Sequence, residues 1–143
     1  MVMDKLRGSI AINIMAHGQH LMMVGGNPPF IYTIGNHLHN LPELLVIGCP
    51  MSMGHVVNLL CDRMRTQGTP FDNGGLVDIG GKVPLKIINA HPVVKDEYTI
   101  QAGQYFGTED YAVQQILIPD LEGRYPGEAG CAKPYRLIPV FAA

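Results

Sequence analysis

The chain has 143 residues, enough for one domain with a single hydrophobic core. Ten basic residues stand against twelve acidic ones, so the formal net charge of -2 provides no broad positive field for a nucleic-acid backbone. The chain contains no apolar run of about 18 residues, no signal-peptide pattern at its amino end and no C-x-x-C pair among its three cysteines, so we expect a cytoplasmic protein without a membrane or nucleic-acid partner.

The share of charged residues is low for a globular protein. Hydrophobic residues make up 47% of the chain and charged residues 15%, whereas about 25% charged residues is typical. A surface with so little charge leaves apolar area that another copy of the chain can cover. We therefore expect a homo-oligomer.

Four apolar runs predict strands in the first third of the chain. Residues 9–15 alternate in polarity and are expected to form a hairpin with residues 21–24. The breaker Gly-Gly-Asn-Pro-Pro at residues 25–29 precedes residues 30–34, which are rich in β-branched and aromatic side chains. The continuous apolar run at residues 42–48 predicts a strand that is buried on both faces at the centre of a sheet.

A helix is expected after these strands. Ser52 can cap it, and Gly68 stands just past its expected end. The apolar residues between them recur at helical spacing: Met53, Val56, Val57, Leu60 and Met64.

The remainder of the chain predicts three more strands and a second helix. Residues 82–90 read as a strand in which Pro84 favours an edge or the first positions. Asp96 can cap a helix whose shared face consists of Tyr98, Ala102, Tyr105 and Phe106. Residues 111–118 predict a last central strand, and residues 135–141 a final edge strand. The order predicts one α+β domain over residues 1–143, with a mainly antiparallel or mixed sheet and two helices packed on one side of it.

Two histidines are weak candidates for a metal site. His37 and His39 would point the same way in a strand and could reach one divalent ion. The site would need a third ligand such as Glu43, His55 or His91, which the spacing does not supply. Hydrogen-bonded loop histidines are the alternative.

Two other motifs could belong to an enzyme but are incomplete. Residues 49–54 lie between a strand and a helix, as a serine nucleophile would, but Pro50 replaces the first glycine of that motif and Ser52 can serve as a helix cap. Residues 75–82 have the wrong spacing for a phosphate loop, and Val83 replaces its Ser or Thr. Because no complete catalytic set is discernible, we expect binding without catalysis.

An arginine beside an aromatic ring marks the acidic turn at residues 119–128. The guanidinium group of Arg124 could bind phosphate or carboxylate, and Tyr125 could stack on a flat ligand. Pairing of Asp120 with Arg124 across the turn is the alternative.

Three segments resemble a known family. The Phe-Ile-Tyr-Thr-Ile-Gly of residues 30–35, the Pro-Glu-Leu-Leu-Val-Ile-Gly of residues 42–48 and the Pro-Asp-x-x-Gly-Arg-Tyr-Pro of residues 119–126 are similar to domain-of-unknown-function family number 4262. The family occurs in bacteria and their phages. Leu41 and Gly127 depart from the His and Trp that are common there. The resemblance implies a small cytoplasmic domain without assigning a reaction.

The leading hypothesis is non-catalytic sequestration of a small anionic, nucleotide-like ligand. By analogy, small oligomeric phage proteins sequester nucleotide signals of bacterial defence. The candidate ligand-binding residues are Tyr32, Thr33, His37, Glu43, Lys82, Tyr105, Arg124 and Tyr125. No cofactor is expected on this hypothesis. The alternative is a metal- or flavin-dependent enzyme.

Overall fold

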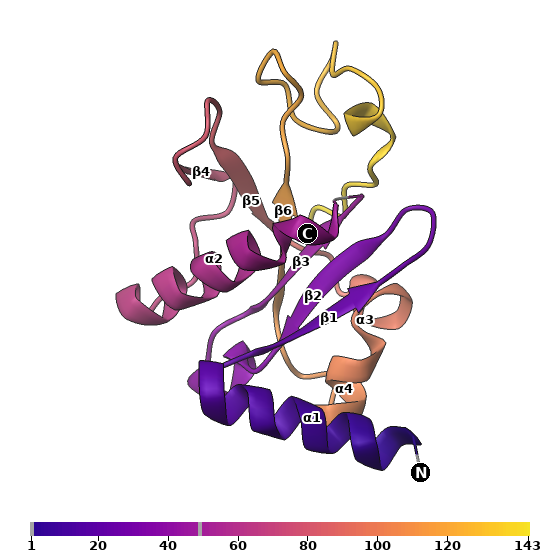
Figure 1. Ribbon diagram of the computed structural model, residues 1–143. Helices are drawn as coiled ribbons and strands as arrows, with labels where there is room; N and C mark the ends of the chain where they lie inside the picture. Colours follow the sequence, from indigo (N-terminus) through magenta and orange to yellow (C-terminus); the bar gives the residue numbers. More distant parts are fainter. Residues whose placement is uncertain (1, 49) are drawn as a thin grey trace.

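The computed structural model describes residues 2–48 and 50–143, and its centre is a six-stranded mixed sheet with the order β1-β2-β3-β6-β5-β4 (Figure 1). The strands are β1 (His20–Val24), β2 (Phe30–Ile34), β3 (Glu43–Ile47), β4 (Gly75–Val77), β5 (Leu85–Asn89) and β6 (Val113–Leu117). Strands β3 and β6 are parallel, and the other neighbours are antiparallel. The mixed sheet confirms the α+β class.

Helices connect and cover the strands. The α-helices are α1 (Val2–His17), α2 (Gly54–Gln67), α3 (Val94–Glu97) and α4 (Ile100–Phe106). The short 3-10 helices are η1 (Asn36–His39), η2 (Met51–Met53) and η3 (Tyr135–Leu137). None of the helices in the described ranges combines the length and the apolar content that a bilayer crossing requires.

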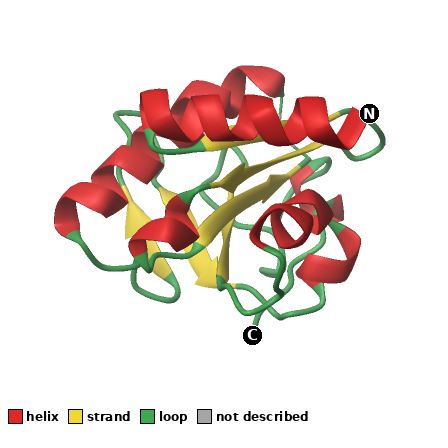
Figure 2. Ribbon diagram, turned by 90° about the horizontal axis from the view of Figure 1, so that it is seen from below, coloured by secondary structure: helices red, strands yellow, loops and turns green. Residues whose placement is uncertain are grey.

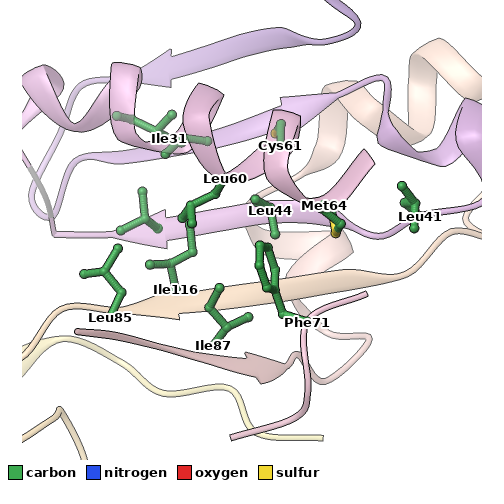
Figure 3. Close-up of a cluster of buried hydrophobic side chains, with 12 residues drawn as sticks. Ile31, Leu41, Leu44, Leu60, Cys61, Met64, Phe71, Leu85, Ile87 and Ile116 are labelled. Atoms are coloured by element: carbon green, nitrogen blue, oxygen red, sulfur yellow. The ribbon is translucent and has the colours of Figure 1, made fainter. Parts of the chain in front are cut away.

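One face of the sheet packs against α2. Because successive side chains of a strand point to opposite faces, Leu44 and Val46 of β3 face this helix. Figure 3 shows Leu60, Cys61 and Met64 of α2 within this buried cluster. The cluster anchors α2 to the central strands.

The opposite face packs against the other helices. Leu45 and Ile47 of β3 join a second cluster with Ile10 of α1, Val94 of α3 and Ala102 of α4. Helices therefore cover both faces of the sheet (Figure 2), and the expectation of two helices on one side was wrong.

Residues 9–15 lie within α1, so the expected first strand and its hairpin were wrong. The isoleucines at positions 10, 12 and 14 alternate as in a strand, which made the pattern ambiguous. In the helix, Leu6, Ile10 and Ile14 share one face at a spacing of four residues and pack on the sheet, while Ile12 is 66% exposed. Strand β1 pairs instead with β2.

Helix α2 begins after η2, without the expected cap. Ser52 is exposed, and no side chain caps the start of α2. Gly68 ends the helix in a left-handed conformation, and its N–H donates to the carbonyl oxygen of Met64 at 2.8 Å, as predicted. Cys61 and Cys131 are free thiols, and Cys49 lies outside the described residues.

The second expected helix is divided into α3 and α4. Asp96 lies in the first turn of α3 rather than at a cap position. Thr99 precedes α4 but does not cap it with its side chain. Its hydroxyl instead forms a 2.7 Å hydrogen bond with the Tyr111 hydroxyl. Tyr98, Ala102, Tyr105 and Phe106 all join the second cluster, but Tyr98 lies between α3 and α4, so the four do not form one face of a single helix.

The carboxyl-terminal segment is not the expected edge strand. It contains η3 and then runs along the sheet, where Gln115 holds it from the middle of β6. The Gln115 amide donates to the carbonyl oxygen of Pro139 at 2.8 Å, and its oxygen accepts the Phe141 N–H at 2.9 Å. The side chain of a buried glutamine thus replaces strand pairing, apart from one bridge between Ala90 and Ala142.

Candidate functional site

A cleft of about 1090 Å³ opens at the edge of the sheet where β3 and β6 begin and β5 ends. Its wall combines apolar and aromatic side chains with polar groups from four separate segments of the chain. The polar groups include His37, Asp72, Asn89, His91, Lys95, Asp110 and Gln114. A concave site lined in this way is the usual form of a small-molecule site.

A buried carboxylate shapes the wall of the cleft around His37. Glu43, at the start of β3, has no exposed surface. Its Oε1 accepts hydrogen bonds from the Thr33 hydroxyl at 2.7 Å and the Asn36 N–H at 3.1 Å. Its Oε2 accepts from the N–H groups of Gly35 at 3.2 Å and His37 at 2.8 Å. The carboxylate therefore fixes the start of η1, which carries His37.

The free energy of unfolding is expected to depend on the protonation of Glu43. Burial raises the pKa of Glu43 from 4.5 to about 7, although the four hydrogen bonds oppose the rise. Between these values the folded chain keeps a proton that the unfolded chain releases. The stability contribution of this carboxyl is therefore present at low pH and is lost as the pH rises through this window, by at most about 1.4 kcal/mol per pH unit.

Urea unfolding of the wild type and Glu43→Gln at several pH values measures this effect. As the pH rises from about 5 to about 7, the wild type should lose free energy of unfolding relative to Glu43→Gln. Above that window the difference between the two proteins should be constant. A difference that shifts in favour of the wild type as the pH rises would contradict the raised pKa.

Aromatic rings and one lysine form another part of the wall. The His37 ring lies 4.8 Å from the Phe106 ring and 6.2 Å from the Tyr111 ring, measured between centroids. Lys95 Nζ lies 5.0 Å from the centre of the Tyr111 ring and donates to the carbonyl oxygen of Glu109 at 2.5 Å. An ammonium group has three N–H donors, so Lys95 can also bind an anionic group in the cleft.

The end of β5 and the start of β6 provide buried and exposed amides. Gln114 Nε2 donates to the carbonyl oxygen of Phe71 at 2.7 Å and to Asn89 Oδ1 at 3.0 Å. Gln114 is only 1% exposed, and its Oε1 has no hydrogen-bond partner among the described residues. Most buried polar atoms are paired, so this unpaired acceptor is an exception in the wall of the cleft.

His91 can serve as a hydrogen-bond donor at the rim. Its Nδ1 accepts the N–H of Val93 at 3.1 Å. In the neutral ring the proton is then on Nε2, because one nitrogen accepts while the other donates. His91 is exposed and lines the cleft, so this N–H is accessible to a ligand.

The eight predicted ligand-binding residues are not gathered in one site. His37 lines the cleft, and Thr33 and Glu43 lie in the buried network behind it. Tyr32 is buried in the second cluster, on the face of the sheet opposite α2, where its hydroxyl is hydrogen-bonded to the Gln101 side chain. Tyr105 lies beside α1, with the Arg7 guanidinium 5.5 Å from the centre of its ring. Four of the eight are thus structural or remote in this fold.

The remaining three predicted residues lie near the opposite ends of β5 and β6. Lys82 and Arg124 are exposed, and neither lines the cleft. Arg124 Nη1 donates to the carbonyl oxygen of Gly130 at 3.3 Å, and the Tyr125 hydroxyl donates to that of Pro84 at 2.6 Å.

The turn at residues 119–128 is organised by Asp120. Its carboxylate accepts the backbone N–H groups of Glu122, Arg124 and Ala132 at 2.8 to 2.9 Å. These hydrogen bonds hold the pKa of Asp120 below its usual range. The turn is therefore closed through backbone groups. The alternative expected from the sequence was a pairing of Asp120 with Arg124, and the Arg124 backbone N–H makes this contact.

The two candidate metal ligands do not face one position. His37 and His39 lie in η1, and a 3-10 helix has three residues per turn, so side chains two residues apart point in different directions. His39 is exposed. In residues 2–48 and 50–143, no group of three or more His, Cys, Asp or Glu side chains is placed to hold a metal ion.

Sequence reasoning missed most of the polar groups in the cleft. Asn89, His91 and Lys95 lie in one segment and Gln114 in another, and only the folded sheet brings them together with His37. One signal was available for Gln114. Two adjacent glutamines inside an apolar strand conflict with burial, and a polar residue at a core position is a mark of function or of a specific contact.

Comparison with known proteins identifies the family of the chain. The model of the family described as "Domain of unknown function (DUF4262)" matches residues 13–132. This range includes the whole sheet, all four segments of the cleft and the Asp120 turn. No curated protein and no solved structure matches the chain. The chain therefore belongs to the DUF4262 family.

Proposed function

We propose that this protein binds a small nucleotide-like ligand, with one anionic group, in the cleft at the start of β3 and β6. The observation that carries the proposal is the cleft itself, whose volume of about 1090 Å³ is sufficient for a small ligand. Its wall includes the half-buried His37 ring and the ammonium group of Lys95, which lies next to the largely buried Tyr111 ring. A flat ring with a negatively charged substituent fits these groups.

The charges around the cleft favour a single phosphate or carboxylate group over a polyphosphate. Lys95 and the two histidines offer positive charge or N–H donors, but Asp72 and Asp110 also line the cleft. Several phosphates placed there would meet like charges from these carboxylates, which weakens binding. The ligand class is therefore a nucleoside monophosphate or a compound of similar shape and charge.

On this proposal the protein binds its ligand without converting it, and acts as a homo-oligomer. Exposed apolar side chains support self-association, with Met15 of α1 89% exposed and Leu121 92% exposed. In a phage, such binding would sequester a nucleotide signal of bacterial defence. Light scattering of the purified chain tests the assembly, and a monomer at high micromolar concentration would contradict it.

Binding of nucleoside monophosphates should raise the melting temperature of the protein. The probes are AMP, GMP, a cyclic dinucleotide and ADP-ribose, and the two monophosphates should give the largest shifts. Replacing Lys95 with Gln should weaken monophosphate binding about tenfold, because it removes the charge-assisted contact.

Variants at the other end of the sheet are the matched controls. Lys82→Gln and Arg124→Gln remove the same charge from exposed positions outside the cleft and should leave binding unchanged. Loss of binding in these controls, with Lys95→Gln unaffected, would move the site to the Asp120 turn. Absence of any thermal shift with all four probes would reject the proposal, and recovery of a converted nucleotide after denaturation would show an enzyme.

A further inference from the structure

We infer that one wall of the cleft is a phosphate subsite, in which the side chains of Asn73, Asn89 and His91 donate hydrogen bonds to the phosphate oxygens. All three side chains line the cleft and are exposed. The inference rests on the proposed function, because it concerns the same cleft. It adds the residues that hold the anionic group, and it selects a phosphate ester among the anions that the cleft could bind.

The side-chain amide of Asn73 is oriented by the backbone of β5. Asn73 Oδ1 accepts the Asn89 N–H at 2.8 Å. An amide side chain has one oxygen, which accepts, and one NH₂ group, which only donates. The oxygen is used within the fold, and no acceptor for the NH₂ group lies in residues 2–48 or 50–143. The NH₂ group of Asn73 is therefore the end that is available to a ligand.

The side-chain amide of Asn89 is oriented in the same way. Gln114 Nε2 donates to the carbonyl oxygen of Phe71 at 2.7 Å, so the atom that it turns toward Asn89, at 3.0 Å, is also a donor. Asn89 must meet this donor with its oxygen, because two NH₂ groups would face each other in the reverse orientation. Its own NH₂ group has no acceptor among the described residues. Asn89 is thus a second donor in the wall.

His91 is a third donor, on the same face as Asn89. The chain stays paired beyond the end of β5, because the Ala90 N–H donates to the carbonyl oxygen of Val113 at 2.9 Å and the His91 N–H to that of Phe141 at 2.7 Å. In an extended segment, side chains two residues apart point to the same face. The imidazole offers Nε2–H, since its Nδ1 accepts a backbone N–H at 3.1 Å.

Three neighbouring donors whose acceptor atoms are already used fit a group that only accepts hydrogen bonds. A phosphate ester has three terminal oxygens, whereas a carboxylate has two and would leave one donor unused. Hydrogen bonds from N–H groups to an ionised oxygen are about twice as strong as those between neutral groups. Asp72 and Asp110 line the same cleft, so direct hydrogen bonds, together with the ammonium group of Lys95, have to hold the anion against these carboxylates.

Asn73→Asp and Asn89→Asp test the inference by titration calorimetry with AMP and adenosine. Aspartate keeps the oxygen that the fold uses and replaces the free donor with a carboxylate oxygen, which repels phosphate. In the wild type, AMP should bind about tenfold more tightly than adenosine, and each substitution should reduce this preference to about twofold or less. The affinity for adenosine, which lacks the phosphate, should stay within about twofold of the wild type.

Asn58→Asp is the matched control. Asn58 Oδ1 accepts from Nε2 of the buried Gln19 at 2.7 Å, as Asn89 does from Gln114, but Asn58 lies in α2 and does not line the cleft. The control should keep the wild-type preference for AMP. A preference that survives in both Asn73→Asp and Asn89→Asp, or that is lost equally in the control, would overturn the inference.

Amide NMR signals of the wild type give a result that does not depend on a variant. AMP should shift the side-chain NH₂ signals of Asn73 and Asn89 more than adenosine does, and should leave that of Asn58 in place. Equal shifts with the two ligands would overturn the phosphate subsite. If AMP binding is weakened by Lys95→Gln but not by the two Asp variants, the phosphate lies elsewhere in the cleft and the proposed function stands. Failure of both ligands to bind the wild type would reject the proposed function as well.

Discussion

Replacing Glu43 with Ala is expected to lower the free energy of unfolding by about 4 kcal/mol. The substitution leaves four donors, the Thr33 hydroxyl and the N–H groups of Gly35, Asn36 and His37, without their buried acceptor. Each unpaired buried group costs about 1–3 kcal/mol before the backbone relaxes. Urea unfolding at pH 7.5, followed by circular dichroism, measures the loss.

Two variants bracket this prediction. Glu43→Gln keeps one acceptor oxygen but turns an NH₂ group toward N–H donors, so a loss of about 2 kcal/mol is expected. Glu122→Ala removes an exposed carboxylate and should change the stability by less than about 0.5 kcal/mol. If Glu43→Ala were as stable as Glu122→Ala, the carboxylate would have no structural role.

The Glu43 network also connects the cleft to α2. Thr33 Oγ1 accepts the Leu44 N–H at 2.9 Å while donating to Glu43. Asn36 Oδ1 accepts from Arg65 Nη1 at 3.1 Å, so α2 holds the residue that precedes His37. The same contacts that stabilise the fold therefore place one ring of the proposed site. Loss of binding in Glu43 variants would follow from displacement of His37 rather than from a direct ligand contact.

The central strands could be predicted because their signals are local. Residues 30–34, 42–48 and 111–118 are short apolar runs bounded by Gly, Pro or Asp, and they form β2, β3 and β6. The amino-terminal segment was missed because residues 10–14 satisfy both a strand and a helix period. Tertiary packing of Ile10 and Ile14 decides between the two, and sequence periodicity cannot provide that information.

The site was harder to predict than the fold because it depends on long-range placement. The Arg124 turn has a strong local pattern, but its carboxylate and backbone groups satisfy one another. The cleft has no local pattern. Its groups come from residues 37–42, 69–73, 89–95 and 110–114, and the segments that precede β3 and β6 meet because these strands are parallel neighbours. His37 could be named from its residue type, whereas Gln114 could be placed in the cleft wall only from the folded structure.

Replacing Gly35 with Ala is expected to destabilise the protein by about 3–4 kcal/mol. Gly35 has φ 142° and ψ -30°, a conformation that essentially only glycine adopts. A Cβ at this position would lie 2.7 Å from the Gly18 carbonyl oxygen and 2.9 Å from the Gln19 Cα. Both atoms belong to the backbone that connects α1 to β1, so neither can move aside cheaply.

Gly8→Ala is the matched control for this substitution. Gly8 lies within α1, and a Cβ there would meet no atom within 4 Å. Alanine has a higher helix propensity than glycine, so the control should gain about 0.5–1 kcal/mol. Urea midpoints of the two variants should therefore move in opposite directions from the wild type. A Gly35→Ala protein with the wild-type midpoint would show that the α1–β1 connection leaves room for a side chain at the start of η1. Close packing at Gly35 would then not be one of the contacts that, with Glu43, position His37 in the cleft.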